Sequence, residues 1–295
     1  MLARQICAKF LLRQLGLLFS ITISTGPLWA SEILLKGKIL SYAGGCISCH
    51  TDTANNGALL AGGKKIKTPF GTFISPNITP DKVHGIGKWS ERDFIRAVKK
   101  GISPENSHYF PVFPYTSFSL MRNTDIKSIK DYIFTLPAVP KVNQAHNLSF
   151  PYNVRLIQVL WKFLYFSEET YVYDSKRSAI WNRGAYLSRA VVHCVECHTP
   201  RTPFGGIIKK LSYAGKGENE FPFINNAPNI TSHLINGIGK WSVQQIMTYL
   251  ETGENPSGDF AGNSMAEVIE SGTGKLSEAD RKAIAVYIRS IRPKP

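Results

Sequence analysis

The chain has 295 residues, 43% of them hydrophobic, and a formal net charge of +14 at pH 7. This length corresponds to about two domains of ordinary size. The basic balance indicates a surface that attracts acidic partners, but no basic cluster falls in a recognised nucleic-acid-binding module, which argues against nucleic acid as a partner.

Residues 1–30 have the pattern of a secretory signal peptide. They carry three basic residues and no acidic one, then an apolar run over residues 15–23 and Leu-Trp-Ala at residues 28–30. An uncleaved membrane anchor is the alternative, but the run is well short of the ~20 residues that a spanning helix needs. A later apolar stretch, residues 156–166, is also too short and contains Lys162. We therefore expect a mature protein that is soluble or peripheral, in the periplasm.

Cleavage after residue 30 removes Cys7 and three of the 35 Lys and Arg residues, which leaves 32 against 21 acidic residues, a net charge of +11. The four remaining cysteines all belong to two Cys-x-x-Cys-His motifs. The first motif contains Cys46, Cys49 and His50, and the second contains Cys194, Cys197 and His198. This spacing admits a disulfide, a redox pair, half of a zinc site or the attachment of a cofactor.

Covalent haem explains the motif best. A disulfide gives no reason for a histidine after each second cysteine, and a thioredoxin-like redox pair needs a βαβ setting that neither site has. Zinc ribbons separate their cysteine pairs by about 15–20 residues, whereas Cys46 and Cys194 are 148 residues apart. Two thiols at this spacing can form thioethers to one porphyrin, and the next residue can bind its iron. The sequence therefore predicts two covalent haem c groups, with His50 and His198 as proximal ligands.

The sequence around the motifs is duplicated. Residues 76–79 and 228–231 both read PNIT, and residues 85–90 and 237–242 both read GIGKWS, with an offset of 152 in each case. Such self-similarity indicates two copies of one unit.

Each copy is expected to be helical. A capping box and an apolar stripe follow GIGKWS, and they end at Gly101 in the first copy and at Gly253 in the second. A second amphipathic helix closes each copy, over residues 126–136 and 277–291. No convincing run of alternating strand residues appears. The sequence predicts an all-α fold of two units, each wrapped around its cofactor.

These patterns divide the chain into a signal peptide over residues 1–30, a first unit over 31–140 and a second unit over 178–295. The intervening residues 141–177 are rich in aromatic side chains. Their length and polarity argue against a flexible linker. We expect a connector packed over the interface of the two units; the alternative is that some of its rings line the gap between the haems.

The mature chain resembles the two-haem cytochromes c related to the cytochrome subunits of periplasmic alcohol, gluconate and aldehyde dehydrogenases. The most specific stretches are residues 68–89, 181–201 and 265–290. The resemblance implies two tandem class I cytochrome c domains that relay electrons from a periplasmic dehydrogenase toward quinone, a terminal oxidase or another cytochrome. Those dehydrogenase subunits often carry three haems, whereas this chain has motifs for two. The expected partners are redox proteins, with at most a peripheral contact to the inner membrane.

The sixth iron ligand tunes each haem, and methionine opposite histidine raises its potential and closes the iron. For the second haem, Met265 lies after Gly253 in an expected loop, where class I domains place their distal methionine, and it matches the family in MAEVIE. Met247 falls within an apolar helical stripe and is expected in the core.

The first haem has no equivalent methionine, because the offset of 152 from Met265 leads to Phe113, where many relatives have methionine. Met121, eight residues further on, is the predicted ligand. His108 is the rival and would give a bis-histidine haem of lower potential. An open or weakly ligated iron is the third option.

The main functional expectation is an electron carrier without substrate chemistry of its own. The alternative is a haem enzyme, a dihaem peroxidase or a thiosulfate-oxidising cytochrome, in which the first iron is open or unusually ligated. The available Met121 and the lack of an obvious acid/base pair beside the motifs argue against the enzyme.

Overall fold

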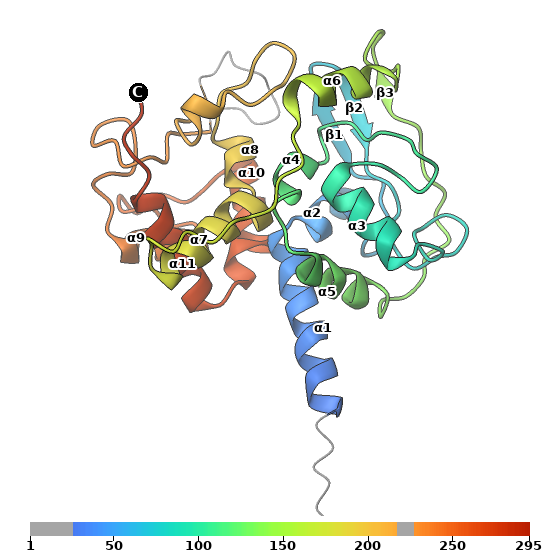
Figure 1. The fold of residues 1–295 in the computed structure, drawn as a ribbon, viewed down its shortest axis with the longest axis horizontal. Helices are drawn as coiled ribbons and strands as arrows, with labels where there is room; N and C mark the ends of the chain where they lie inside the picture. The colour runs from blue at the N-terminus through green and yellow to red at the C-terminus, as the bar shows by residue number, and fades with distance from the viewer. Residues whose placement is uncertain (1–25, 217–226) are drawn as a thin grey trace, which may run out of the picture. The chain divides into compact units, whose positions relative to one another are not determined.

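The computed structural model describes residues 26–216 and 227–295 (Figure 1). The chain divides into two units, Met1–Glu32 and Ile33–Pro295, and nearly all described residues belong to the second. Residues 1–25 of the predicted signal peptide lie outside the described residues. None of the helices in the described part is long and apolar enough to cross a membrane.

The regular secondary structure of the described residues is mainly helical, which is compatible with the predicted all-α class. The tandem arrangement of class I domains stays a prediction. The α-helices are α1 (Gly26–Ala43), α2 (Cys46–His50), α3 (Glu91–Lys100), α4 (Tyr115–Phe118), α5 (Asn123–Ile133), α6 (Ile157–Tyr165), α7 (Ala179–Tyr186), α8 (Cys194–Cys197), α9 (Val243–Thr252), α10 (Asn263–Ser271) and α11 (Glu278–Arg289). Short 3₁₀ turns are η1 (Thr53–Asn55), η3 (Lys209–Leu211) and η4 (Thr273–Lys275), and η2 (Leu187–Val191) is a π-helical turn.

A small antiparallel sheet is a feature that the sequence reasoning missed. β1 (Lys65–Thr68) pairs with β2 (Gly71–Ile74), and β2 pairs with β3 (Asn147–Leu148). Strands of four and two residues are too short to give a recognisable alternation of polar and apolar side chains. The sheet fixes the start of the predicted connector against the first half of the chain.

The two predicted capping boxes are confirmed. Ser90 and Asp93 bond to each other's backbone at the start of α3, and Ser242 and Gln245 do the same at the start of α9. Each helix ends at the predicted glycine, with a left-handed φ of 58° after α3 and 83° after α9. The same local chemistry therefore starts and stops the same helix in both copies.

Two pairs of helices cross at close range, one pair in each half. A Cβ added to Gly37 of α1 would lie 1.9 Å from the carbonyl oxygen of Ser128 in α5, and a Cβ added to Gly184 of α7 would lie 1.9 Å from the carbonyl oxygen of Ala283 in α11. In both crossings a tyrosine one turn further along the second helix also touches the glycine. Only glycine permits this approach, so the duplication extends to the packing of the first and last helices of each copy.

One cluster of buried hydrophobic side chains runs through both halves of Ile33–Pro295. Met247 belongs to it, 5% exposed, as predicted for a core residue. Residues of the predicted connector are tied to both sides: Tyr171 donates from its backbone N–H to the Leu120 carbonyl oxygen (3.2 Å) and from its hydroxyl to the Asn182 carbonyl oxygen (2.9 Å). The boundaries at residues 140 and 177 stay predictions.

Candidate functional site

The first Cys-x-x-Cys-His motif forms the short helix α2. α1 ends at Ala43. Gly45 has a left-handed φ of 74°, and this turn leads the chain from α1 to Cys46, the first residue of α2. Cys46 is half-buried, Cys49 is exposed, and both sulfur atoms are free. The pair is therefore accessible for a covalent attachment.

The second motif is built in the same way. The π-helical turn η2 follows α7, and His193 takes the left-handed conformation, φ 47°, immediately before Cys194. A side chain in that region costs about 1–2 kcal/mol relative to the right-handed region, so the turn is held by its surroundings. Cys194 and Cys197 are half-buried and free.

Both motif histidines are held by a backbone carbonyl. Nδ1 of His50 lies 2.8 Å from the Pro76 carbonyl oxygen, and Nδ1 of His198 lies 2.8 Å from the Pro228 carbonyl oxygen. Because a carbonyl oxygen only accepts, Nδ1 carries the proton and Nε2 keeps its lone pair. Burial lowers the pKa of both histidines, which favours this neutral form. A metal-binding histidine is oriented in this way.

The repeated PNIT sequence holds these carbonyls in place. Oδ1 of Asn77 accepts from the backbone N–H (2.9 Å) and hydroxyl (2.7 Å) of Thr79. Oδ1 of Asn229 accepts from the same groups of Thr231, at 2.8 and 2.6 Å. Each asparagine closes a tight turn directly after the proline whose carbonyl binds the motif histidine.

In each half, one glycine lies between the motif histidine and the PNIT turn that binds it. The backbone N–H of Gly62 donates to the His50 carbonyl oxygen (2.8 Å), and that of Gly215 donates to the His198 carbonyl oxygen (3.0 Å). Their φ angles are 69° and 78°, and a Cβ would lie 2.4 Å from the Pro76 carbonyl carbon in the first case and 2.5 Å from a backbone nitrogen in the second. The sequence reasoning missed these glycines, because they follow their histidines by unequal distances, 12 and 17 residues.

The turns that precede the two motifs touch each other. A Cβ added to Gly45 would lie 3.8 Å from Nε2 of His193. The His193 ring also packs edge-on against Phe118 of α4, with centroids 5.4 Å apart. The residues that precede α2 and α8, Gly45 and His193, thus lie close together beside Phe118 of α4.

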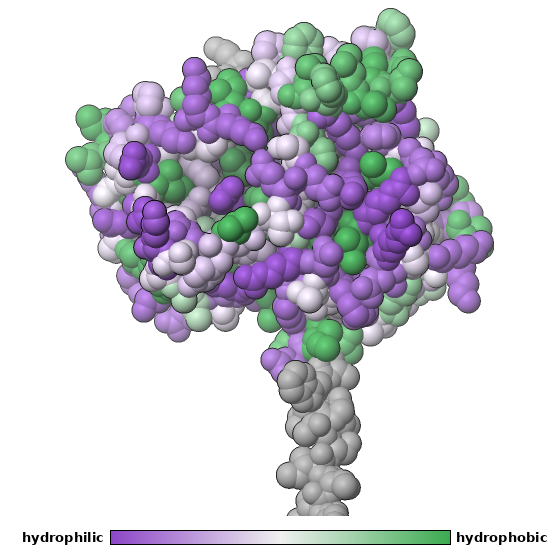
Figure 2. Space-filling view, in the orientation of Figure 1, coloured by the Kyte–Doolittle hydropathy of each residue, from purple (hydrophilic) through white to green (hydrophobic). Residues whose placement is uncertain are grey.

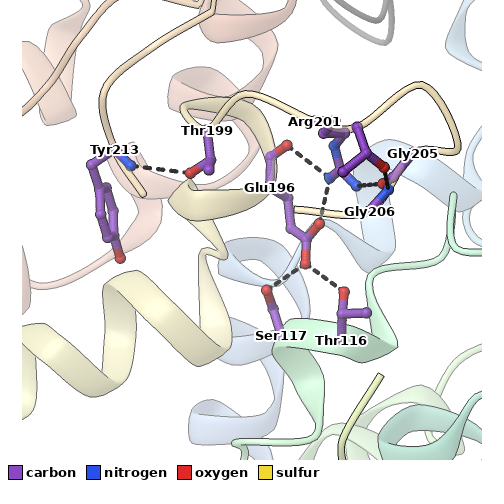
Figure 3. Close-up of polar contacts among 9 residues, drawn as sticks. Thr116, Ser117, Glu196, Thr199, Arg201, Gly205, Gly206 and Tyr213 are labelled. Carbon is purple, nitrogen blue, oxygen red and sulfur yellow. Dashed lines mark hydrogen bonds and ion pairs between the residues drawn. The ribbon is translucent and has the colours of Figure 1, made fainter. Parts of the chain in front are cut away.

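A buried carboxylate inside the second motif reaches across to the first half (Figure 3). Oε1 of Glu196 accepts from the hydroxyls of Thr116 and Ser117 on α4, both at 2.6 Å, and Oε2 pairs with Nη2 of Arg201 at 2.5 Å. Arg201 also donates to the carbonyl oxygens of Glu196 (2.9 Å) and Gly205 (2.8 Å).

Glu196 is charged in this setting. Burial by itself raises the pKa of Glu196, but the Arg201 charge and the two hydroxyls outweigh it and the pKa is lowered. The equivalent position of the first motif holds Ser48. The sequence reasoning considered only the cysteines and histidines of the two motifs and missed this contact.

Met265 is expected in a loop, and this expectation is wrong, because Met265 lies in a helix. It is the third residue of α10 and is half-buried. α10 packs beside α2, because Nζ of Lys64 donates both to the Ser48 carbonyl oxygen (3.0 Å) and to the Glu267 carboxylate. The predicted ligand of the second haem is thus on a helix that contacts the first motif.

The candidates for the first haem lie in different surroundings. Met121 follows α4 and is 1% exposed, enclosed in the core. His108 bridges to Ile102, and its carbonyl oxygen accepts from Nη1 of Arg155 (3.0 Å). The same bridge in the second copy, Glu254 to Phe260, puts phenylalanine where the first copy has His108. Which residue binds the first iron stays a prediction.

Among the residues that the structure describes, no group of three or more His, Cys, Asp and Glu side chains could hold a metal ion by itself. The two cysteine pairs therefore belong to no four-thiolate site of the described chain. The free sulfur atoms and the carbonyl-bound histidines fit covalent haem c in both motifs.

The chain is similar to known cytochromes over most of its length. It is 38% identical over 259 residues to a dihaem c-type cytochrome of Cereibacter sphaeroides, which covers 87% of this chain and 85% of that protein. It is 37% identical to the cytochrome subunit of fructose dehydrogenase from Gluconobacter japonicus and 36% identical to the cytochrome c subunit of a quinone alcohol dehydrogenase from Gluconobacter oxydans.

These two matches cover 88% and 90% of this chain but 52% and 56% of the relatives, so the chain spans little more than half of their length. No family model matches the chain. The two motifs and the relatives indicate a protein with covalently bound haem c. The chain belongs to the family of dihaem c-type cytochromes and dehydrogenase cytochrome subunits, which confirms the predicted resemblance.

Proposed function

We propose that this chain is a periplasmic dihaem cytochrome c that relays electrons from a dehydrogenase to quinone, a terminal oxidase or another cytochrome. Residues 31–140 and 178–295 would form two class I domains, each with one haem, joined by the connector 141–177. The observation that supports the proposal is the proximity of the two Cys-x-x-Cys-His motifs, since a Cβ added to Gly45 would lie 3.8 Å from Nε2 of His193.

The chain's own residues would hold and orient the cofactors. The cysteine pairs of the two motifs would form the thioethers, and His50 and His198 would be the proximal ligands. When bound, haem iron supplies one-electron redox chemistry. The carbonyl oxygens of Pro76 and Pro228 keep Nε2 of these histidines available and fix the ring orientation.

We propose Met265 as the distal ligand of the second haem and Met121 as that of the first. Family membership and the position between Gly253 and the last helix support Met265. Met121 is supported as the remaining methionine of the first unit, against His108 or an open iron. Methionine on both irons would close them to external ligands and keep the protein an electron carrier.

A fixed distance between the haems is what a relay needs, and the contacts of Glu196 support it. Its carboxylate accepts from two hydroxyls of α4 and from one arginine of its own half, in contacts that are largely shielded from solvent. This anchors the helix of the second cysteine pair to the first half. Electrons entering at one haem would then pass to the other without a movement of either motif.

A dehydrogenase partner is proposed because relatives are named as cytochrome subunits of fructose, alcohol and gluconate dehydrogenases. The net charge of +11 that remains without residues 1–30 would attract a partner with an acidic surface. Several of these relatives are much longer than this chain, so the particular dehydrogenase is not inherited from their names.

Rapid photoreduction of the purified holoprotein tests the relay. We expect two low-spin haems, a fast reduction of one and then re-equilibration to the other at a rate that does not depend on protein concentration. In the double variant Cys46→Ala with Cys49→Ala the second phase should vanish. A re-equilibration that scales with protein concentration, or rapid cyanide and carbon monoxide binding by the wild type, would refute the carrier proposal.

A further inference from the structure

The helix α6 buries polar side chains and exposes apolar ones, the reverse of an ordinary surface helix. Its polar side chains face inward, with Gln158 6% and Lys162 7% exposed, while Leu160, Phe163 and Leu164 are 59%, 84% and 59% exposed. Surface helices normally bury the apolar stripe and expose the charged one. Two things follow from this reversed arrangement: a contact within the protein must fix the orientation of α6, and the exposed apolar side chains are available to a binding partner.

The orientation of α6 is fixed by the C-terminal end of α3. Nζ of Lys162 donates to the carbonyl oxygens of Lys100 (2.6 Å) and Gly101 (2.8 Å), which are at the C-terminal end of α3, where carbonyls lack helical partners. The same ammonium lies 4.5 Å from the centre of the Tyr115 ring. Burial lowers the pKa of Lys162 to about 8. These contacts fix the rotation of α6 and force its apolar side outward.

The outward side is continuous. Its side chains on α6 follow each other at spacings of three, one, three and one residues, which is one face of a helix. Phe204, 67% exposed, belongs with them, because its carbonyl oxygen accepts from Nε1 of Trp161 in α6 (2.8 Å). We call this set the α6 apolar face, and it contains Leu156, Val159, Leu160, Phe163, Leu164 and Phe204. Figure 2 shows hydrophobic residues gathered over the position of α6.

The segment that carries most of the face lacks negative charge. Residues 132–167 contain no acidic residue; Lys141 and Arg155 are basic, and Lys162 faces inward. The first carboxylates after the face, Glu168 and Glu169, form ion pairs with Lys100 (3.0 Å) and Lys209 (3.6 Å). The chain without residues 1–30 carries +11. An anionic surface can therefore approach this face without repulsion.

The chemistry of the face favours lipid over protein. Its six side chains are Leu, Val and Phe, which offer no hydrogen-bonding group, whereas protein interfaces carry about one hydrogen bond per 100–200 Å² and a polar rim. Trp161 and Tyr165 lie half-buried beside the face, and such rings are favoured at membrane–water interfaces. A hydrocarbon boundary with anionic headgroups satisfies both the apolar side chains and the surrounding positive charge.

We propose that the α6 apolar face docks onto an anionic membrane surface, with α6 lying in the plane of the headgroups. This attachment is peripheral and does not depend on the haems or on their proposed relay. It uses the connector between the two motifs, so the haem-bearing halves would be held at the membrane by a part of the chain that binds neither cofactor.

Sedimentation of the haem-loaded full chain with vesicles tests the proposal. The vesicles are phosphatidylglycerol with phosphatidylethanolamine, compared with pure phosphatidylcholine. The test variant is Leu160→Ser with Phe163→Ser. The matched control is Leu234→Ser with Ile235→Ser, two adjacent side chains that are 62% and 83% exposed elsewhere on the surface. All four substitutions are at exposed positions, and haem content and reducibility are checked in each variant.

We expect binding to anionic vesicles that drops at least about tenfold in the test variant, because each apolar side chain withdrawn from lipid is worth roughly a factor of ten. The control variant should bind as the wild type does. Equal binding of test variant and wild type would overturn the proposal, since another segment would then be the anchor. Absent vesicle binding, together with loss of self-association or of dehydrogenase binding in the test variant, would overturn it in favour of a protein interface.

Discussion

The Oε1 atom of Glu196 lies 2.6 Å from the Ser117 hydroxyl oxygen, and this contact joins the second Cys-x-x-Cys-His motif to α4 of the first half. The two residues are 79 positions apart in the chain. Both are buried, so the bond is shielded from water and salt. The spacing of the two Cys-x-x-Cys-His motifs therefore depends on a carboxylate that lies between the two cysteines of the second motif.

Removing this carboxylate should loosen both halves. We expect Glu196→Ala to lower the free energy of unfolding by about 3–5 kcal/mol, because it takes away the buried counter-charge of Arg201. It should also raise the reduction potential of the second haem, since a negative charge close to the iron is lost. Denaturant unfolding and a redox titration of the holoprotein measure the two effects.

An exposed ion pair provides the comparison for Glu196. Glu169 pairs with Lys209 at 3.6 Å on the surface, and Glu169→Ala should cost less than about 1 kcal/mol and leave both potentials unchanged. If the two variants lose similar stability, Glu196 has no special anchoring role.

The two helix crossings should tolerate no side chain larger than that of glycine at residues 37 and 184. We expect Gly37→Ala and Gly184→Ala each to destabilise the protein by more than about 3 kcal/mol, because the new Cβ would overlap a backbone carbonyl oxygen. Thermal unfolding followed by circular dichroism measures this. Gly262→Ala is the control, since a Cβ there meets nothing within 4 Å and its φ is −106°. A stable Gly37→Ala protein would contradict the described crossing.

The asparagine of the first PNIT turn should matter more than that of the second. Besides its bonds to Thr79, Asn77 donates to the carbonyl oxygens of Val139 (2.8 Å) and Lys141 (3.0 Å), whereas among the described residues Asn229 donates to that of Lys294 (2.9 Å). We expect Asn77→Ala to cost about 2–4 kcal/mol and Asn229→Ala about 1 kcal/mol less. Parallel urea titrations measure both losses of unfolding free energy. An equal loss, or a larger loss for Asn229→Ala, would show that the bonds to residues after the last helix of each unit contribute little to stability.

The distal ligands are tested by substitution and spectroscopy. In Met265→Leu the second haem should lose its methionine–iron charge-transfer absorption, and in Met121→Leu the first haem should lose it. Met247→Leu, a change of similar volume inside the core, should leave both intact. Low-temperature EPR of each oxidised variant gives the readout.

A Met121→Leu protein with an unchanged spectrum would remove Met121 as a ligand. A bis-histidine signal would then assign His108 to the first iron. A high-spin signal with ready ligand binding would instead favour an open iron.

The parts of the fold that could be predicted are those with local chemistry. Ser90 with Asp93, and Ser242 with Gln245, define helix starts that need no tertiary information. α10 was missed because Gly262 precedes it without a side-chain cap, so nothing marked the start of the helix that carries Met265.

The missed parts of the site depend on contacts between distant residues. The bond between Glu196 and Ser117 cannot be read from a motif in which residues between the cysteines vary. The rotation of α6 likewise depends on Lys162 reaching the end of α3, 61 residues earlier in the chain. Periodicity identifies an apolar side of a helix, but it does not say whether that side faces the core.

The intact mass of the mature protein, with haem staining after denaturation, tests haem attachment directly. We predict two covalently attached haems in the wild type. We predict one haem in the double variant Cys46→Ala with Cys49→Ala, and one in Cys194→Ala with Cys197→Ala. A wild-type mass without haem, or with bound zinc or disulfides in its place, would contradict the assignment of both motifs.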